Sequence, residues 1–464
     1  MPFFGGLLSL PSFVEQFPRI DTVSTTGSKE SENARIEGTV VALYTVGCMF
    51  GALSCFKLGD KFGRLRTIAI GCTFIIIGSI LLSTSFSLGQ LIVGRLDLGL
   101  GFGAISATVP WIDLGFYFTD TSVSWRFPLA FPIVFALIIL AFLPFLPDSP
   151  RWLVKKGRIE EARAVMAILE DVDENSPTVE EDIVKMQYSL EEMGKGSFKE
   201  LLSNKEDRLL NRTLLPMFAT FSQQINGIGV IGFYTTTIFE QFIGLSPTIA
   251  RILSGSIYIW QLLCCFVTFW TVDRIGRRKL MMFGVVGMGA CASIIAGAVS
   301  NAENSETCAM VAAVFVFLFA AFFGIGALGI NYLYGTEVAP LAFRVPIYAL
   351  STTTLWIFNF LVVEVTPVGF ANIGYKYYIV FACTNLLLLL PIIYFFLPET
   401  QQRSLEDMDT VFREAKNPFD VVKVSRHMKK IPASALGASK DRGIGRNGRI
   451  WDDEKLNEQK LENV

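Results

Sequence analysis

Histidine is almost absent from this sequence, and cysteine shows none of its usual site patterns. The one histidine, His427, lies in a polar segment near the end of the chain, so a histidine proton relay and a histidine-ligated metal centre are excluded. The eight cysteines include no Cys-x-x-Cys pair, which argues against a disulfide framework and a zinc site. The formal net charge is −2, with no basic face for nucleic acid. We expect no cofactor, no metal and no nucleic-acid partner.

The sequence is rich in long apolar segments. Hydrophobic residues make up 52% of the chain and the mean hydropathy is +0.47, which is too high for a soluble domain of this size. A helix that crosses a bilayer needs about 20 apolar residues. Segments of about this length occur at 38–58, 67–87, 90–110, 126–147, 213–235, 250–271, 280–300, 308–334, 346–369 and 377–397. They predict an all-α integral membrane protein with about ten complete spans.

Basic residues predict which ends of these spans face the cytoplasm. Loops 57–66 and 274–279 each carry four Lys or Arg residues, whereas 87–89, 236–249 and 301–307 carry none. Short loops rich in Lys and Arg stay on the cytoplasmic side of a membrane. The two basic loops should therefore share that side, together with the charged stretch that begins at Arg151.

One charged loop occurs twice. Segment 59–66 (GDKFGRLR) returns as 272–279 (VDRIGRRK), 213 positions later, and 147–149 (PDS) is echoed by 398–400 (PET), 251 positions later. Two related halves are typical of many secondary transporters. The two offsets differ by 38 residues, so the first half is shorter by about one span and its loop.

Counting the crossings finds the same deficit. Span 90–110 returns to the cytoplasm, and span 126–147 must also end there, before Arg151. The intervening 111–125 is too short to cross as a helix. The first half therefore lacks one helix between these spans, whereas the second half needs no such correction.

Several motifs in this order resemble the sugar porter branch of the major facilitator superfamily, and above all its fungal hexose and monosaccharide transporters. The resemblance covers about residues 3 to 410. It implies two pseudo-repeated six-helix bundles with twelve helices, of which this chain lacks the start of helix 1 and most of helix 5. The motifs are the loops at Asp60 and Asp273, Gly94-Arg95, 147–153 (PDSPRWL), Gln223-Gln224, Glu337 with Arg344, and 398–400 (PET).

We divide the chain into four parts on this basis. Residues 1–150 form an incomplete N-terminal transmembrane bundle, and 151–212 a helical linker on the cytoplasmic side. Residues 213–400 form the C-terminal bundle. The polar tail 401–464 is cytoplasmic and partly disordered.

Neutral amides suggest a substrate site. Gln223, Gln224 and Asn226 fall inside an apolar span, where unpaired amides are costly, so they line a cavity or bond to one another as contacts between helices. The resemblance implies that Gln223 and Gln224 bind sugar hydroxyls. It adds Tyr234, Tyr332, Trp356 and Asn359 to the substrate site. Gly229 and Leu355 depart from the family pattern, in which asparagine is usual at both positions.

A carboxylate within a span is a functional hypothesis by default, and Glu364 is one. We assign proton coupling to Arg95 and Glu364. In proton-coupled members of the family, an aspartate on the first helix pairs with the arginine that corresponds to Arg95, and this chain begins after that position.

The repeated loops suggest a gate. Asp60, Gly63 and Arg64 in the first loop match Asp273, Gly276 and Arg277 in the second. Carboxylates there can cap a helix and pair with the arginines, and such a clasp can open and close during alternating access. Glu337 and Arg344 would form the matching clasp of the second half. The alternative is that both loops only anchor the chain on the cytoplasmic side.

The resulting hypothesis is a multi-pass carrier of monosaccharides or related polyols, most simply a proton symporter that works as a monomer in the plasma membrane. Its partners would be a sugar, protons and the lipid bilayer. We do not expect an enzyme, because the sequence shows no nucleophile–base set. The alternatives are a passive sugar facilitator, a transporter-like sugar sensor and an inactive truncated paralogue.

Overall fold

The computed structural model describes residues 11–20, 25, 28–101, 123–193, 201, 208–302, 305–340, 343–403, 405–415 and 417–427 of the 464-residue chain. These residues form helices and, within these ranges, no strand, as the sequence predicts. The junction at 110–111, where we place the missing helix, lies outside the described residues, as do 428–464 of the tail.

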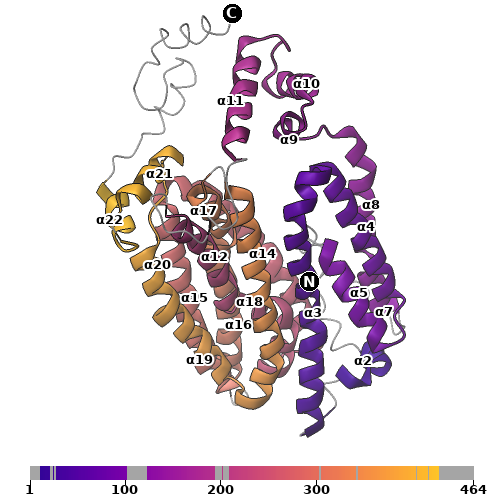
Figure 1. The fold of residues 1–464 in the computed structure, drawn as a ribbon. Helices are drawn as coiled ribbons and strands as arrows, with labels where there is room; N and C mark the ends of the chain where they lie inside the picture. Colours follow the sequence, from indigo (N-terminus) through magenta and orange to yellow (C-terminus); the bar gives the residue numbers. More distant parts are fainter. Residues whose placement is uncertain are drawn as a thin grey trace, which may run out of the picture.

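The helices of the N-terminal half stand on one side of the molecule, and those of the C-terminal half on the other (Figure 1). The first group is α2 (Pro11–Gln16), α3 (Ser28–Phe62), α4 (Arg64–Ser83), α5 (Leu88–Gly101), α7 (Val123–Ala130) and α8 (Pro132–Phe142), with 3-10 turns at Pro18–Ile20 and Leu143–Phe145. The second is α12 (Leu209–Ile225), α13 (Ile228–Thr237), α14 (Pro247–Ile275), α15 (Arg277–Val299), α16 (Glu306–Phe323), α17 (Ile330–Val338), α18 (Arg344–Ile373), α19 (Lys376–Cys383) and α20 (Leu390–Phe396). Single π-helical turns follow α13, α16 and α19, at Ile238–Phe242, Gly324–Leu328 and Thr384–Leu389. The two halves meet where α3 packs along α18.

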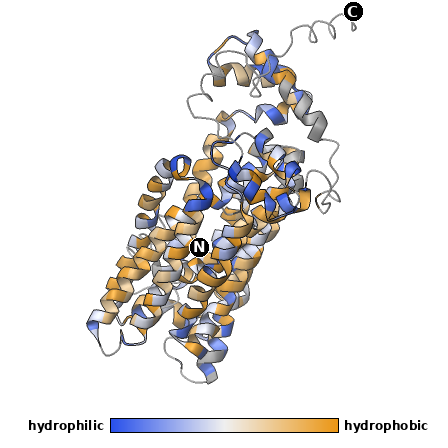
Figure 2. Cartoon of the chain, turned by 90° about the vertical axis from the view of Figure 1, so that its left-hand side faces the viewer, coloured by the Kyte–Doolittle hydropathy of each residue, from blue (hydrophilic) through white to orange (hydrophobic). Residues whose placement is uncertain are grey.

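The apolar helices match the predicted spans. Among the described residues, eight helical segments are long and apolar enough to cross a membrane: Glu32–Ser54, Leu65–Ser83, Trp125–Phe145, Pro247–Ile275, Arg277–Val299, Glu306–Val338, Pro346–Ile373 and Lys376–Phe396. Figure 2 shows apolar residues along the bundle and polar residues gathered at its ends. Large apolar side chains also face outward, such as Phe269, which is 76% exposed. Lipid, rather than water, is the solvent that accommodates such side chains on a helix.

The two remaining predicted spans are also helical. For span 90–110, helix α5 is described as far as Gly101. Span 213–235 consists of α12 and α13, separated at Asn226 and Gly227. Gly227 has φ +101°, a left-handed conformation that glycine adopts without steric cost and that ends α12.

The sequence repeat is also a structural repeat. Gly63 joins α3 to α4 with φ +87°, and Gly276 joins α14 to α15 with φ +101°. A Cβ at Gly63 would lie 3.0 Å from the ring of Trp152, and one at Gly276 would lie 2.6 Å from the Glu399 carboxylate. The glycine of each charged loop therefore contacts the matching PDS or PET segment of its own half: Trp152 follows 147–149, and Glu399 lies within 398–400. Glycine suits both positions because of the positive φ and the lack of space for a side chain.

The linker and the start of the tail lie toward the same end of the bundle (Figure 1). The linker forms α9 (Pro150–Lys155), α10 (Ile159–Glu170) and α11 (Pro177–Met193), and the tail begins with α21 (Leu405–Glu414) and α22 (Asp420–His427). Arg212, at the start of α12, is 2% exposed and forms a 2.6 Å ion pair with Asp409 of α21. Its Nε also donates to the carbonyl oxygen of Val338 at 2.9 Å. This arginine attaches the tail to the ends of α12 and α17.

Candidate substrate site and charged clasps

Buried amides from α12 and α18 meet across the helix interface. Nδ2 of Asn359 donates to Oε1 of Gln224 at 2.6 Å. Gln223 is 3% exposed, and within the described residues its Oε1 has no hydrogen-bond partner. A buried amide oxygen without a partner is costly unless a ligand supplies a donor. The structure thus pairs two of the predicted substrate residues, Gln224 and Asn359, and within the described residues Oε1 of Gln223 and Oδ1 of Asn359 have no hydrogen-bond partner.

Asn226 holds the break between α12 and α13. Its Oδ1 accepts a hydrogen bond from the backbone N–H of Ile228 at 2.9 Å, and its carbonyl oxygen accepts one from Nδ2 of Asn385 at 2.8 Å. A Cβ at Gly227 would lie 2.8 Å from the ring of Phe381, so only glycine fits there. Asn226 therefore has a structural role at the end of α12, and its contact with substrate stays a prediction.

The family departure at Gly229 occurs in a crowded place. A Cβ there would lie 3.3 Å from Val362 and 3.9 Å from Nδ2 of Asn359. An asparagine at this position would reach the amide pair. Because this chain has glycine instead, the site has fewer amide groups near Asn359, and the neighbouring surface at Val362 is apolar.

Trp356 of α18 packs against the other half of the molecule. Its ring stands edge-on to Tyr44 of α3, with 6.3 Å between centroids and an interplanar angle of 90°. The guanidinium of Arg95 lies 5.8 Å from the Tyr44 centroid, and Nη2 of Arg95 donates to the carbonyl oxygen of Val41 at 2.8 Å. Tyr44 therefore connects a predicted coupling residue with a predicted substrate residue. The sequence analysis missed Tyr44, because one tyrosine in an apolar span carries no signal of its own.

Glu364 lies where α3 and α18 approach closely. Its Oε1 accepts a hydrogen bond from Oγ1 of Thr39 at 2.7 Å, and its Oε2 has no hydrogen-bond partner in the described part of the chain. A Cβ at Gly38 would lie 2.7 Å from the carbonyl oxygen of Glu364, so this glycine permits the approach.

A second carboxylate, Glu37, lies on the same stretch of α3 and is 4% exposed. Tyr234 lies within the electrostatic range of Glu37, Arg95 and Glu364, and its hydroxyl donates to the carbonyl oxygen of Val363 at 3.2 Å. The sequence analysis missed Glu37 because the predicted span began at residue 38. The helical span begins at Glu32, and a window drawn from there would have included it.

The second charged loop forms a clasp with α17. Nη2 of Arg277 donates to Oε1 of Glu337 at 2.7 Å, and its Nη1 contacts Oδ1 of Asp273 at 2.8 Å. Oε2 of Glu337 accepts a further hydrogen bond from Oγ1 of Thr400 at 2.6 Å. Oε1 of Glu399 accepts one from the backbone N–H of Arg277 at 2.9 Å, at the N-terminus of α15 where a negative charge is favourable.

Arg344 has different surroundings from those we expected. Among the described residues, Glu337 forms its ion pair with Arg277. Arg344 lies at the start of α18, close enough to Arg151 for the two positive charges to interact. Burial lowers the pKa of Arg344, and the charge of Arg151 lowers it further. In the first loop the backbone places Gly63 between α3 and α4, but the side chains of Asp60 and Arg64 lie outside the described residues.

Comparison with known proteins places this arrangement in a family. The model of the family described as "Sugar (and other) transporter" matches residues 3–112 and 110–412. The chain belongs to this family. The two matches meet at 110–112, where the spacing of the repeats and the count of crossings place the missing helix.

Curated relatives are transporters by name. The chain is 38% identical over 429 residues to the MFS-type transporter oryC of Aspergillus oryzae. The aligned region covers 84% of this chain and 79% of the relative. It is 32% identical over 480 residues to the sugar transporter STL1 of Saccharomyces cerevisiae, covering 94% of this chain and 83% of the relative. An alignment of 480 positions is longer than the 464-residue chain, so part of it stands opposite gaps in this chain.

A solved structure shares the fold. The proton:xylose symporter XylE, bound to 6-bromo-6-deoxy-D-glucose, superposes with a TM-score of 0.69 at 20% identity, covering 89% of this chain and 97% of that chain. The major facilitator fold predicted from the motifs is thereby confirmed. The protein is a multi-pass membrane transporter of the sugar porter family and not an enzyme.

Proposed function

We propose that this protein carries monosaccharides or related polyols across the plasma membrane by alternating access, coupled to proton symport. The observation that carries the proposal is the Gln224–Asn359 hydrogen bond beside the open acceptor of Gln223. Amides that join two helices and retain free acceptor capacity suit a ligand with many hydroxyls. The names of the relatives support the substrate class: a sugar transporter from yeast and a low-affinity glucose transporter, HXT3, from the same organism.

Substrate binding would use α12 and α18 together. Gln223, Gln224 and Asn359 would bind the hydroxyls, and Trp356 would pack against an apolar face of the sugar ring. A ligand held between these helices can bias the angle between the two halves, because Trp356 also touches Tyr44 of the opposite half.

Proton coupling would use Glu364. Its Oε2 is the atom that would take the proton, because Oε1 already accepts from Thr39. Protonation at Oε2 would remove a negative charge from the interface of α3 and α18 and leave the Thr39 hydrogen bond in place. Glu37 and Arg95 would set the local field through their proximity to Tyr234.

The gate would use the cytoplasmic clasp. Breaking the Arg277–Glu337 pair would release α17 from the start of α15, and re-forming it would restore one conformation. A monomer contains all of these groups, so we take the monomer as the working unit.

Uptake of labelled sugar tests the proposal. We would express the chain in cells that lack their own sugar carriers and measure initial rates from pH 5 to pH 8. Symport predicts uptake that falls as pH rises, whereas a flat profile would favour the passive facilitator. Saturable uptake would contradict both the sensor and the inactive paralogue. Glu364→Gln should remove the pH dependence, and Glu306→Gln, at an exposed helix end, should keep it.

A further inference from the structure

One asparagine interrupts the last apolar span. Asn385 is 0% exposed and lies in the π-helical turn Thr384–Leu389 between α19 and α20, where five leucines follow it in the sequence. A buried polar side chain in a membrane span is costly unless it forms hydrogen bonds, and such side chains often join helices. The hydrogen bonds of Asn385 therefore show which part of the molecule it holds.

Asn385 joins this span to the end of α12. Its Nδ2 donates to the carbonyl oxygen of Phe381 in its own helix and to that of Asn226, both at 2.8 Å. Asn226 is the C-cap of α12. The last carbonyl groups of a helix have no partner within that helix, so they need donors from elsewhere. Asn385 supplies such a donor at the point where α12 stops.

Close packing confines this region. A Cβ at Gly289 of α15 would lie 3.2 Å from Cβ of Asn385, and one at Gly227 would lie 2.8 Å from the ring of Phe381, one turn before Asn385. The two glycines let α15 and the break between α12 and α13 approach this span closely. A side chain that is already confined loses little further freedom when it forms a hydrogen bond.

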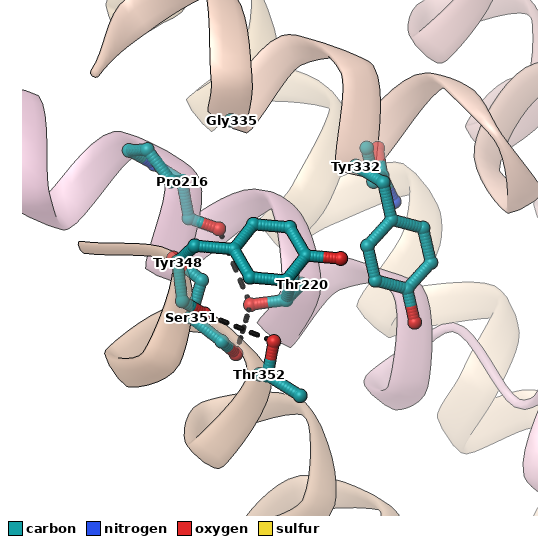
Figure 3. A pocket seen from close by; sticks show the side chains of 8 residues that line it. Pro216, Thr220, Tyr332, Gly335, Tyr348, Ser351 and Thr352 are labelled. Atoms are coloured by element: carbon teal, nitrogen blue, oxygen red, sulfur yellow. Dashed lines mark hydrogen bonds between the residues drawn. The ribbon is translucent and has the colours of Figure 1, made fainter. Parts of the chain in front are cut away.

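Helix α12 is also held by α18. Oγ1 of Thr220 donates to the carbonyl oxygen of Ser351 at 2.8 Å (Figure 3), and Gln224 is bonded to Asn359. Tyr332 of α17, a predicted substrate residue, lines the same narrow space as Thr220 and Ser351.

Gln223 depends more on the backbone. Its Oε1 has no hydrogen-bond partner in the described part of the chain, so no side-chain contact of this atom fixes its direction. The direction of this acceptor is therefore set by the backbone of the last turn of α12.

Helix α13, beyond the break, is tied to a different neighbour. The hydroxyl of Tyr258 on α14 donates to the carbonyl oxygen of Gly232 at 2.6 Å, and Oγ1 of Thr236 donates to Oγ of Ser254 on α14 at 3.1 Å. The two sides of the break are thus held by different helices. The bond from Asn385 holds the α12 side at the break itself.

We propose that Asn385 is a positioning residue for substrate binding. Its bond to Asn226 fixes the last turn of α12, and this turn carries Gln223 and Gln224, three and two residues before Asn226. Three residues of α-helix rise about 4.5 Å, so both amides lie within one turn of the bond. The inference rests on the proposed function, because Asn385 acts through the amides that bind the sugar there.

Equilibrium binding tests this role. We would purify the whole chain in detergent and measure binding of radiolabelled D-glucose and D-xylose. Asn385→Leu keeps the volume of the side chain and Asn385→Ala does not, but both lack the donor. Both should weaken affinity about fivefold, because each loses the hydrogen bond that holds the turn. The number of binding sites per folded protein should stay the same, whereas a residue that only stabilises the fold would lower that number and leave the affinity unchanged.

The neighbouring residue offers a matched control. Oγ1 of Thr384 donates to the carbonyl oxygen of Val380 at 2.9 Å, four residues earlier, as Asn385 does to that of Phe381. Thr384→Val removes this bond and leaves the one to Asn226 in place. It should bind sugar like the parent.

Hydrogen exchange at the break gives a second measurement that needs no sugar. The backbone N–H of Ile228 donates to Oδ1 of Asn226 at 2.9 Å. Amides in the segment 226–230 should exchange faster in both Asn385 variants than in the parent, and at the parent's rate in Thr384→Val.

The outcomes separate the two proposals. If both Asn385 variants bind and exchange like the parent, the positioning role is overturned and the proposed function stands. A loss of affinity in Asn385→Ala alone would indicate packing and overturn the role, as would an equal loss in Thr384→Val. A parent that binds neither sugar would overturn the proposed function. Exchange would then decide whether Asn385 holds the end of α12: faster exchange supports this and an unchanged rate overturns it.

Discussion

Tyr44 and Trp356 join the two halves of this transporter by an edge-to-face contact, with ring centroids 6.3 Å apart and planes at 90°. Tyr44 belongs to α3 of the N-terminal half and Trp356 to α18 of the C-terminal half. The guanidinium of Arg95 lies over the Tyr44 ring, 5.8 Å from its centroid. The contact is therefore a direct physical link between the predicted coupling residue and the predicted substrate residue.

Replacing Tyr44 should weaken substrate binding without direct contact to substrate. We expect Tyr44→Ala to lower affinity about fivefold, because an aromatic pair contributes about 1 kcal/mol and its loss frees the Trp356 ring. Tyr44→Phe keeps the ring and should bind like the parent. Radioligand binding to the purified protein checks this, and equal losses in both variants would show that the hydroxyl, not the ring, matters.

The amide pair should separate stability from binding. Gln224→Ala leaves Nδ2 of Asn359 without its partner, which should cost about 1–3 kcal/mol in unfolding free energy and abolish saturable uptake. The double variant Gln224→Leu/Asn359→Leu removes both polar groups, so it should recover most of the stability and still fail to bind. Thermal unfolding in detergent measures the stability of each variant, and sugar uptake measures its activity. A double variant that transports sugar would contradict the proposed site.

The two acidic partners of Arg277 should differ in importance. The Glu337 side chain is 22% exposed and that of Asp273 is 76% exposed, whereas the side chain of Arg277 is 9% exposed. Glu337→Ala leaves a mostly buried guanidinium short of its counter-charge and should cost about 3 kcal/mol. Asp273→Ala removes a solvent-screened partner and should cost about 0.5 kcal/mol. Melting temperatures of the two variants test the order, and equal shifts would be inconsistent with it.

Two glycines at either end of α15 should respond differently to replacement by alanine. Gly276→Ala places a side chain at φ +101° and 2.6 Å from the Glu399 carboxylate, so we expect a loss of about 2 kcal/mol or more. Gly297 lies within α15, and a Cβ added there would have no other atom within 4 Å. Gly297→Ala should therefore be neutral or stabilise by about 0.5–1 kcal/mol, because alanine favours the helix. Expression level and thermal unfolding of the two variants give the answer.

Prediction from the sequence succeeded where the signal is local or repeated. Apolar length led to the helices, because it reflects the solvent around a short segment, and the two echoes 213 and 251 positions apart led to the two halves. The sidedness inferred from the basic loops stays a prediction. The positive φ of Gly63 and Gly276 confirms that the repeat marks equivalent turns.

The contacts of the site required the tertiary structure. Gln224 and Asn359 are 135 positions apart and Arg277 and Glu337 are 60 apart, and nothing in either local segment specifies its partner. Glu37 and Tyr44 gave no usable pattern, because one acidic or aromatic residue in an apolar helix has the same appearance whether it faces a partner or lipid. The sequence by itself determined the class of protein, the helices that span the membrane and the turns that repeat. Only the packing of α3 and α12 against α18 decided which side chains meet, because helix rotation and crossing are set by contacts between segments far apart in the chain.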